Sequence, residues 1–313
     1  DGALAEAILD YIVQKAGTDA NWRVFADQVL YVCYDRSPAL SKVQQDRNAR
    51  FGKRFEARVA DATNMTAAIG KGRLKGVVLS NELPDAFSVH KIILSPDGAA
   101  DVAFVVPSLA AATWTAVKPL LPASVTGPIE DADRAIEDRF FERRRDGDVY
   151  LTRATFVALL EGLRTSEAYE GTANAMQFRE LYVPAVNVPV VAEHLRRYAD
   201  TYAAVLARDP RGLVSYVNPG AESFIRGASE VLSAGYVLTI DYGGNWEEML
   251  AQHTYPRFRT YGPSQQTGAY LAPNQIDTFA PYVGPTLNDF TTDANFSLLA
   301  AEGELVGLRP VYY

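Results

Sequence analysis

The 313-residue sequence has only one cysteine and three histidines. It therefore has few side chains that could form a disulfide, a catalytic thiol or a zinc site. The single cysteine, Cys33, excludes an internal disulfide, and its place in the apolar run at residues 29–34 is typical of a small buried side chain. The three histidines, His90, His194 and His253, are too few and too far apart for a zinc site built from cysteine and histidine. A bound metal would therefore take most of its ligands from carboxylates and amides.

Positive charge and long apolar runs are also lacking. The net charge of −8 disfavours nucleic acid as a general partner, because a phosphate backbone requires a basic surface. No apolar stretch reaches the roughly 20 residues of a membrane helix, and no signal-peptide pattern opens the chain. With 48% hydrophobic residues the chain can bury one large core or two modest ones. We expect a globular cytoplasmic protein that binds neither nucleic acid nor membrane.

The first part of the chain alternates between helix and strand patterns. Residues 3–15 have apolar side chains at helical spacing, and Ser37 followed by Pro38 predicts a helix that starts there and runs to about residue 50. Residues 29–34, 55–60 and 76–79 have the patterns of strands, the last of them a buried parallel strand. This order predicts an α/β fold with a mostly parallel, doubly wound sheet.

The middle of the chain has a different pattern, with helices separated by proline and glycine. Residues 131–145, 152–163 and 190–207 are the helical candidates. The earlier rhythm returns with a helix after Pro219 and a strand at 235–242. We divide the chain into a first core part (1–118), a large helical insertion (119–212) and a second core part (213–313). An insertion at this place commonly covers the strand-end cleft as a lid.

Polar groups gather just after the predicted strand at 76–79. Asn81, Glu82, Asp85 and His90 follow it, and open α/β sheets bind ligands just beyond the carboxyl ends of their strands. The alternative is that this segment only ends the strand and turns the chain.

Acidic residues end three other strand patterns. Asp35, Asp61 and Asp241 each precede a turn or a helix start. A carboxylate at such a position can accept two hydrogen bonds from a ribose diol, and another can accept from an adenine amine. Each one alone could instead be an ordinary helix N-cap. Three of them at strand ends of one sheet favour a cofactor that contains a nucleoside.

Several segments together resemble one protein family. The most specific is Asn-Glu-Leu-Pro-Asp-Ala at 81–86, followed by Val-His-Lys at 89–91. Weaker matches occur in the family's order at 1–9, 34–44, 241–243, 259–261 and 289–296. On these residues the chain resembles the MidA-type class I methyltransferases, relatives of the mitochondrial complex I assembly-factor methyltransferase.

The resemblance implies a seven-stranded Rossmann-like sheet and S-adenosylmethionine as methyl donor. Gly2 would close the glycine-rich loop under the donor, Asp35 would hold the ribose, and Asp61 with the Ala62 amide would bind adenine. Asn81 and Glu82 would face the methionine part or the acceptor. The expected catalytic side chains on the acceptor side are Glu82, Asp85, His90 and, across the cleft with Asp241, Tyr242.

The resemblance leaves the acceptor open. We expect a small molecule, free or tethered to a carrier protein, bound beneath the lid. A divalent metal, Fe or Mn, held by His253, Asp241 and Gln265 would assist C-methylation of a carbonyl compound in natural-product assembly. The alternatives are N-methylation of a protein arginine held by carboxylates, and a non-catalytic methyltransferase-like assembly factor. A NAD-dependent dehydrogenase is disfavoured because no third glycine follows Gly2 at the required offset.

The resemblance also bears on the ends of the sequence. Asp1 and Gly2 correspond to the middle of the family's glycine loop, and the family continues beyond Tyr313. We therefore expect a fragment of a longer chain, acting as a monomer or as a domain of a larger polypeptide.

Overall fold

The computed structural model describes residues 1–140, 147–208, 211–251, 258–261, 266–267 and 289–311. The chain divides into two compact units. Unit 1 comprises Asp1–Asn81, Gly220–Ile240 and Leu298–Tyr313, and unit 2 comprises Glu82–Pro219 and Asp241–Ser297. Within the described residues, no helix has the length and apolar character that crossing a membrane requires.

Unit 1 contains two pairs of parallel strands with helices packed around them. β1 pairs with β2, and β3 pairs with β9. The strands are β1 (Tyr31–Asp35), β2 (Phe55–Val59), β3 (Leu74–Asn81) and β9 (Leu232–Ile240). The helices are α1 (Ala3–Ala16), α2 (Ala20–Gln28), α3 (Pro38–Arg47), η1 (Ala49–Arg54), η2 (Ala62–Asn64), α4 (Met65–Ile69) and most of α11 (Pro219–Val231) and α13 (Phe296–Leu305).

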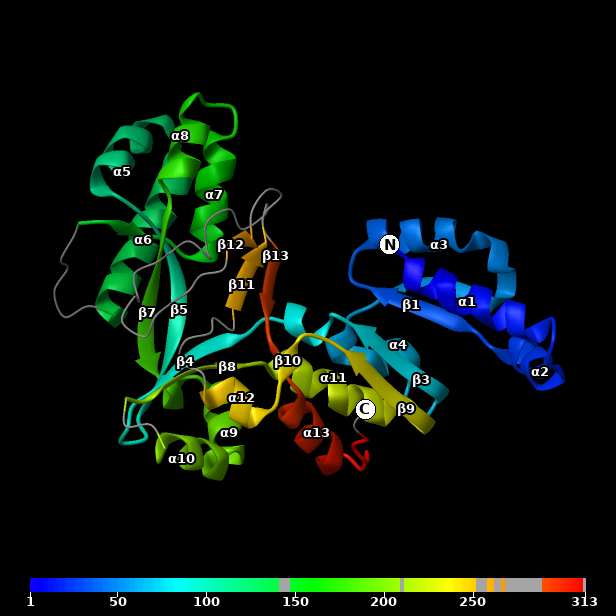
Figure 1. The fold of residues 1–313 in the computed structure, drawn as a ribbon. Helices are drawn as coiled ribbons and strands as arrows, with labels where there is room; N and C mark the ends of the chain where they lie inside the picture. Colours follow the sequence, from blue (N-terminus) through cyan, green and yellow to red (C-terminus); the bar gives the residue numbers. More distant parts are fainter. Residues whose placement is uncertain (141–146, 209–210, 252–257, 262–265, 268–288, 312–313) are drawn as a thin grey trace. The chain divides into compact units, whose positions relative to one another are not determined.

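Sequence and packing agree in the first half of unit 1. Helix α1 lies beside β1 (Figure 1). Its apolar side is buried through Ala5, Leu9 and Ile12, which pack in one cluster with Phe55 of β2. The side chain of Ser37 accepts a hydrogen bond from the Leu40 N–H at 3.3 Å, so the predicted start of α3 is confirmed.

The helix predicted after Pro219 is also confirmed. It is α11, whose predicted core side chains Phe224, Ile225, Ala228 and Val231 are all buried. The strand predicted at 76–79 forms as part of β3 and is parallel to β9, as expected. The prediction that this strand is buried is wrong in part, because Val77 is 54% exposed.

Unit 2 is organised around an antiparallel sheet. Its strands follow the order β6-β5-β4-β8, and β7 also pairs with β5. These strands are β4 (His90–Leu94), β5 (Ala100–Leu109), β6 (Val149–Tyr150), β7 (Gln177–Pro184) and β8 (Leu213–Val217). The smaller strands, in the groups β12-β11-β13 and β10-β14, are β10 (Gly243–Gly244), β11 (Phe258–Tyr261), β12 (Gln266–Thr267), β13 (Asp289–Thr292) and β14 (Ala294–Asn295).

The antiparallel sheet corrects the prediction of a mostly parallel sheet throughout the chain. β4 and β5 form a hairpin, closed where the Ser95 N–H donates to the Ala99 carbonyl at 2.8 Å. The turn is Pro96-Asp97-Gly98, with Gly98 at φ +87°, and it leaves no room for the helical crossover that parallel strands need. Parallel pairing holds for β1–β2 and β3–β9, and the doubly wound arrangement is not confirmed.

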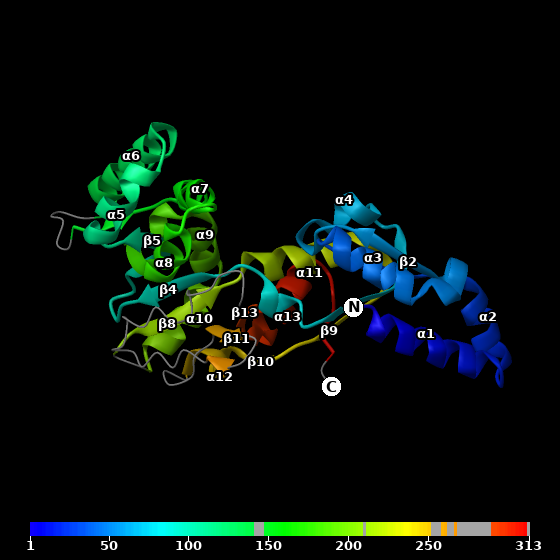
Figure 2. The same ribbon diagram turned by 90° about the horizontal axis from the view of Figure 1, so that it is seen from above.

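The segment predicted as a helical insertion contains strands as well as helices. Its helices are α6 (Ala123–Phe140), α7 (Arg153–Leu163), α8 (Ala168–Ala175), η5 (Ala185–Asn187), α9 (Pro189–Arg197) and α10 (Ala199–Leu206). The other helices of unit 2 are η3 (Pro84–Ala86), α5 (Ala111–Val117), η4 (Lys118–Leu120), which ends at the start of the insertion, and α12 (Trp246–Ala251). Helices α5 to α8 gather near one end of β5 and β7 (Figures 1 and 2). The strands β6 and β7 were not predicted, and a lid role for the segment stays a prediction.

Candidate functional site

The segment after β3 combines a strained residue with a short helical turn. Glu82 has φ +48°, the one positive φ among the described non-glycine residues. Such a conformation costs about 1–3 kcal/mol and is found mainly where the surrounding structure enforces it. The turn η3 follows, and the buried Asn218 side chain donates to the Pro84 carbonyl at 2.8 Å. Asp85 is the next residue of this turn.

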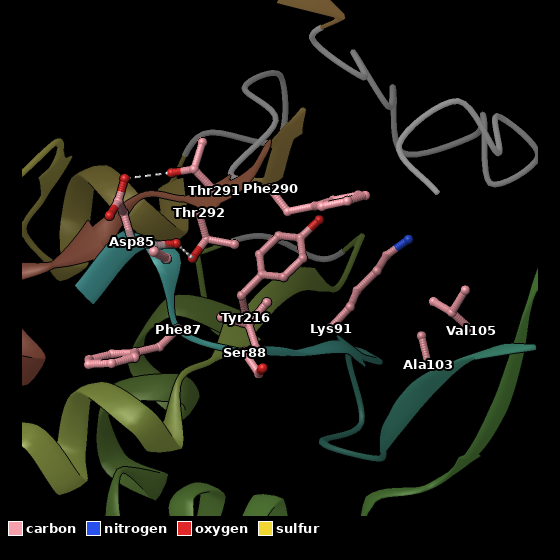
Figure 3. Close-up of a pocket in the computed structure, with 12 residues that line it drawn as sticks. Asp85, Phe87, Ser88, Lys91, Ala103, Val105, Tyr216, Phe290, Thr291 and Thr292 are labelled. Atoms are coloured by element: carbon pink, nitrogen blue, oxygen red, sulfur yellow. Dashed lines mark hydrogen bonds between the residues drawn. The ribbon is translucent and has the colours of Figure 1, made fainter. Parts of the chain in front are cut away.

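Asp85 is the central polar residue of unit 2. It is 8% exposed, and its Oδ2 accepts a hydrogen bond from the Thr291 hydroxyl at 2.7 Å. Thr292 donates to the Asp85 carbonyl at 3.4 Å (Figure 3). The Asp85 N–H donates to Asp241 Oδ2 at 3.2 Å. The other carboxylate oxygen, Oδ1, is buried and has no hydrogen-bond partner among the described residues. A buried oxygen of this kind is costly unless a ligand or water satisfies it.

A cavity of about 300 Å³ lies beside Asp85. Its walls come from η3 and the start of β4, from β5, from β8 and from β13 (Figure 3). The lining residues are Asp85, Ala86, Phe87, Ser88, Val89, Lys91, Ala103, Val105, Tyr216, Phe290, Thr291 and Thr292. Six of the twelve lining residues are polar or charged, and the other six are apolar. Small-molecule sites combine apolar walls with such polar groups.

Lys91 and Glu180 form a buried ion pair at this cavity. Lys91 Nζ lies 2.7 Å from Glu180 Oε2, and the two side chains are 9% and 5% exposed. The Tyr182 hydroxyl donates to the same Glu180 oxygen at 2.5 Å. Burial, with Glu180 nearby, raises the pKa of Tyr216, which keeps this lining phenol neutral at physiological pH. No role was predicted for these four residues.

Asp241 directly follows β9 and interacts with Asp85. Burial, and then the negative charges of Asp85 and Glu82, raise the pKa of Asp241 to about 6 from an ordinary value of 3.8. Hydrogen bonds from the Asp85 and Tyr242 N–H groups oppose this shift. Asp241 therefore changes its charge near neutral pH, a property often found in functional sites.

Asp241→Asn should change how stability depends on pH. Between about pH 4 and pH 6 the folded wild type binds more protons than the unfolded chain, so the contribution of Asp241 is full below pH 4 and is lost as pH rises through 6. An asparagine side chain does not titrate, so the variant does not lose stability in this way as pH rises. From pH 4.5 to 7.5 the variant should gain about 1 kcal/mol of unfolding free energy over the wild type, a value reduced by solvent screening of this partly exposed group. Urea unfolding at several pH values measures this, with Asp97→Asn in the β4–β5 turn as control. Parallel curves for the variant and the wild type would contradict the assignment.

The predicted donor-binding residues lie in unit 1 and do not line this cavity. Asp35 ends β1, and its oxygens accept from the Ser37 N–H at 2.8 Å and from Gln44 Nε2 at 3.3 Å. A carboxylate has about four acceptor positions, so both oxygens retain capacity for ribose hydroxyls. Asn81 is the exposed last residue of β3. The donor-binding roles of these residues stay predictions.

Asp61 and Gly2 also have clear local roles. Asp61 is the N-cap of η2, in which Ala62 is the first residue, and its Oδ1 accepts from the Thr63 N–H and hydroxyl at 2.8 and 2.7 Å. Gly2 has φ +85°, and a Cβ there would lie 2.7 Å from Asn48 Nδ2. The glycine is required by its conformation and by this close approach.

Three of the predicted catalytic residues, Glu82, His90 and Tyr242, do not line the cavity. His90 is the half-buried first residue of β4, and burial lowers its pKa. Tyr242 is 63% exposed. Of the predicted metal ligands, His253 and Gln265 lie outside the described residues. In the described part of the chain, no three His, Cys, Asp or Glu side chains are grouped so as to hold a metal ion.

Two solved structures from Burkholderia thailandensis are similar to this chain. One is described as a "likely methyl transferase" bound to S-adenosyl-homocysteine, with 17% identity and a TM-score of 0.55 over 98% of this chain and 53% of that chain. The other, an uncharacterized protein, has 16% identity and a TM-score of 0.44 over 89% of this chain and 50% of that chain. The first comparison supports a shared α/β fold. This chain spans about half the length of both proteins.

The remaining comparisons concern sequence alone. No curated protein matches the chain. One family profile matches it over residues 1–313. The chain therefore belongs to the family described as "Putative S-adenosyl-L-methionine-dependent methyltransferase".

Proposed function

We propose that the protein transfers a methyl group from S-adenosylmethionine to an acceptor bound in the Asp85 cavity. The observation that carries this proposal is Asp85, a buried carboxylate that lines the cavity and whose Oδ1 has no hydrogen-bond partner among the described residues, in a chain of this family. A protein of similar fold binds S-adenosyl-homocysteine, the product left by the donor. Methyl transfer is an in-line displacement, so the protein's main task is to hold donor and acceptor in line in a dry site.

The two units would serve the two substrates. Unit 1 would bind the donor, with Asp35 accepting hydrogen bonds from the ribose and Asp61, Ala62 and Gly2 in the roles described above. Unit 2 would bind the acceptor, and Asp85 would accept the proton that the acceptor loses. A cavity of about 300 Å³ suits a small molecule or the end of a carrier-tethered chain. The proposal extends to a lid formed by residues 119–212, and it requires no step through a metal.

Arginine methylation is the second candidate. Asp85, Asp241 and Glu82 are close enough for their charges to influence one another, and a cluster of carboxylates is the expected binding site for a guanidinium group. The cavity itself favours the first candidate, because Lys91 contributes an ammonium group to its lining.

Asp35→Ala should weaken donor binding. Loss of charge-assisted hydrogen bonds to the ribose should reduce the affinity for S-adenosyl-homocysteine by about 1.5–3 kcal/mol, or about 10- to 150-fold. Calorimetric titration of the wild type and the variant measures the change. Asp46→Ala on the exposed face of α3 is the control, and circular dichroism checks the fold. Equal affinities for wild type and Asp35→Ala would remove Asp35 from the donor site.

A further inference from the structure

The polar groups on one face of the unit 2 sheet form a cluster at the acceptor cavity. Lys91 of β4 and Tyr216 of β8 are direct cross-strand neighbours, so their side chains lie on the same face. Glu180 of β7 reaches Lys91, and Tyr182, two residues further along β7, reaches Glu180. Lys91 and Tyr216 both line the cavity. We call Lys91, Glu180, Tyr182 and Tyr216 the lysine cluster.

An ion pair is not the arrangement that would stabilise this buried part of the sheet most. Desolvation of two charges offsets most of their attraction, so a buried ion pair stabilises a fold little compared with apolar side chains of similar size. Lys91 has three N–H donors, and Glu180 is its one polar partner among the described residues. Donor capacity of Lys91 therefore remains for a ligand in the cavity.

The cavity offers opposite hydrogen-bonding groups on its two sides. Asp85 lies on one side and Lys91 on the other, with Tyr216 and Phe290 between them (Figure 3). A complementary ligand donates a hydrogen bond at one end and accepts one at the other. A guanidinium group alone would satisfy Asp85 and leave the donors of Lys91 unused.

The charge of the ligand's hydrogen-bond acceptor determines how well that group can bind Lys91. Glu180 already neutralises the ammonium, so a free carboxylate on the ligand would add a second negative charge beside a buried one. A carbonyl oxygen accepts the hydrogen bond without adding charge. The lysine cluster therefore favours a ketone, ester or thioester over a free acid.

We propose that the methyl acceptor is a small carbonyl compound, whose carbonyl oxygen binds Lys91 and whose methyl-accepting group donates its proton to Asp85. This inference rests on the proposed function. In the reaction, the accepting atom loses its proton to the Asp85 carboxylate and forms a bond to the methyl carbon. The bond between methyl carbon and sulfur breaks, and its electron pair stays on sulfur to give S-adenosyl-homocysteine.

The test measures binding of a neutral carbonyl probe to the full chain saturated with S-adenosyl-homocysteine. The probe is the acetoacetyl thioester of N-acetylcysteamine, compared with free acetoacetate and with Nα-acetylarginine amide. The variant Lys91→Met/Glu180→Gln removes both charges together, so no buried charge is left unpaired, and the new amide oxygen can still accept from Tyr182. The matched control is Lys118→Met/Glu130→Gln, which removes an ion pair whose side chains are 46% and 44% exposed.

The proposal predicts that the wild type binds the thioester more tightly than acetoacetate. The Lys91/Glu180 variant should lose about tenfold or more in thioester affinity, while its affinity for S-adenosyl-homocysteine and its melting temperature stay close to those of the control. Equal thioester affinity in variant and control would overturn the inference, as would tighter binding of acetoacetate, or arginine-amide binding that depends on Asp85 and not on Lys91. Titration with S-adenosyl-homocysteine comes first. Absence of binding in that titration would contradict the proposed function itself, and it is distinguished in this way from a failure of the inference about the carbonyl acceptor.

Discussion

Asp85→Asn should slow methyl transfer by about 10²- to 10⁴-fold, the usual contribution of a positioned proton acceptor. Asparagine has nearly the same shape as aspartate, and its oxygen can still accept the hydrogen bond that Thr291 donates to Asp85. The backbone hydrogen bond from residue 85 to Asp241 is unaffected. The substitution therefore removes charge and basicity at Oδ1 and preserves the local fold. The measurement is the rate of S-adenosyl-homocysteine formation with a mixture of carbonyl compounds, alcohols, amines and guanidines.

Two further variants distinguish loss of the proton acceptor from a change in the local structure around Asp85. Asp97→Asn makes the same chemical change in the exposed β4–β5 turn and should leave the rate unchanged. Thr291→Val removes the hydrogen bond that orients the carboxylate, and the rate should fall by less than in Asp85→Asn. Donor affinity should be the same in all three variants. If Asp85→Asn transferred methyl groups at the wild-type rate, Asp85 would not be the proton acceptor.

Gly235→Ala should destabilise the protein by about 3 kcal/mol or more, because the added atom meets backbone that has no freedom to move. Gly235 lies opposite Gly76 in the β3–β9 pair and has φ +141°. A Cβ at this position would lie 1.7 Å from the Gly76 carbonyl oxygen. The strands must separate or the pairing must shift. The measurement is the free energy of unfolding in urea, with hydrogen exchange in β3 and β9 to localise the change.

Gly98→Ala is the matched control for this effect. Gly98 also has a positive φ, of +87°, but a Cβ there would meet nothing within 4 Å. This variant should show the conformational cost alone, about 1 kcal/mol. Equal losses in the two variants would show that the close approach of β3 and β9 contributes nothing.

Local signals in the sequence predicted several of the helices, whereas α2, α5, α8, α12 and α13 were not predicted. Ser37 before Pro38 marks the start of α3, the apolar spacing after Pro219 matches α11, and Thr152 is the N-cap of α7. Each depends on residues within one or two turns of helix, so tertiary contacts need not be known. The predicted helix at 190–207 is broken into α9 and α10 at Tyr198.

The antiparallel sheet was missed because its pairing is not local. β5 and β7 are adjacent in the sheet, although a long stretch of chain separates Ala103 from its partner Tyr182 on the other strand. Periodicity gives no information on such partners. The Pro96-Asp97-Gly98 turn was the one local signal for the β4–β5 hairpin, and the prediction did not use it.

The candidate site was predicted in part for the same reasons. The segment at 81–90 directed attention to Asp85, which lines the cavity, and to His90, which does not. Successive side chains of a strand point to opposite faces, so His90 and Lys91 cannot both face the cavity from β4. Glu180 was identified only from its ion pair with Lys91 in the structure. No spacing in the sequence indicates that these two residues are in contact.

The most direct test of the account is a calorimetric titration of the wild-type protein with S-adenosylmethionine, as purified and again after chelation with a divalent metal added back. The account predicts saturable binding in the chelated sample, because the residues assigned to the donor are Asp35, Asp61, Ala62 and Gly2. Binding restored only by the metal would add a metal ion to the site. No binding under any of these conditions would contradict the proposed function and favour a methyltransferase-like assembly protein.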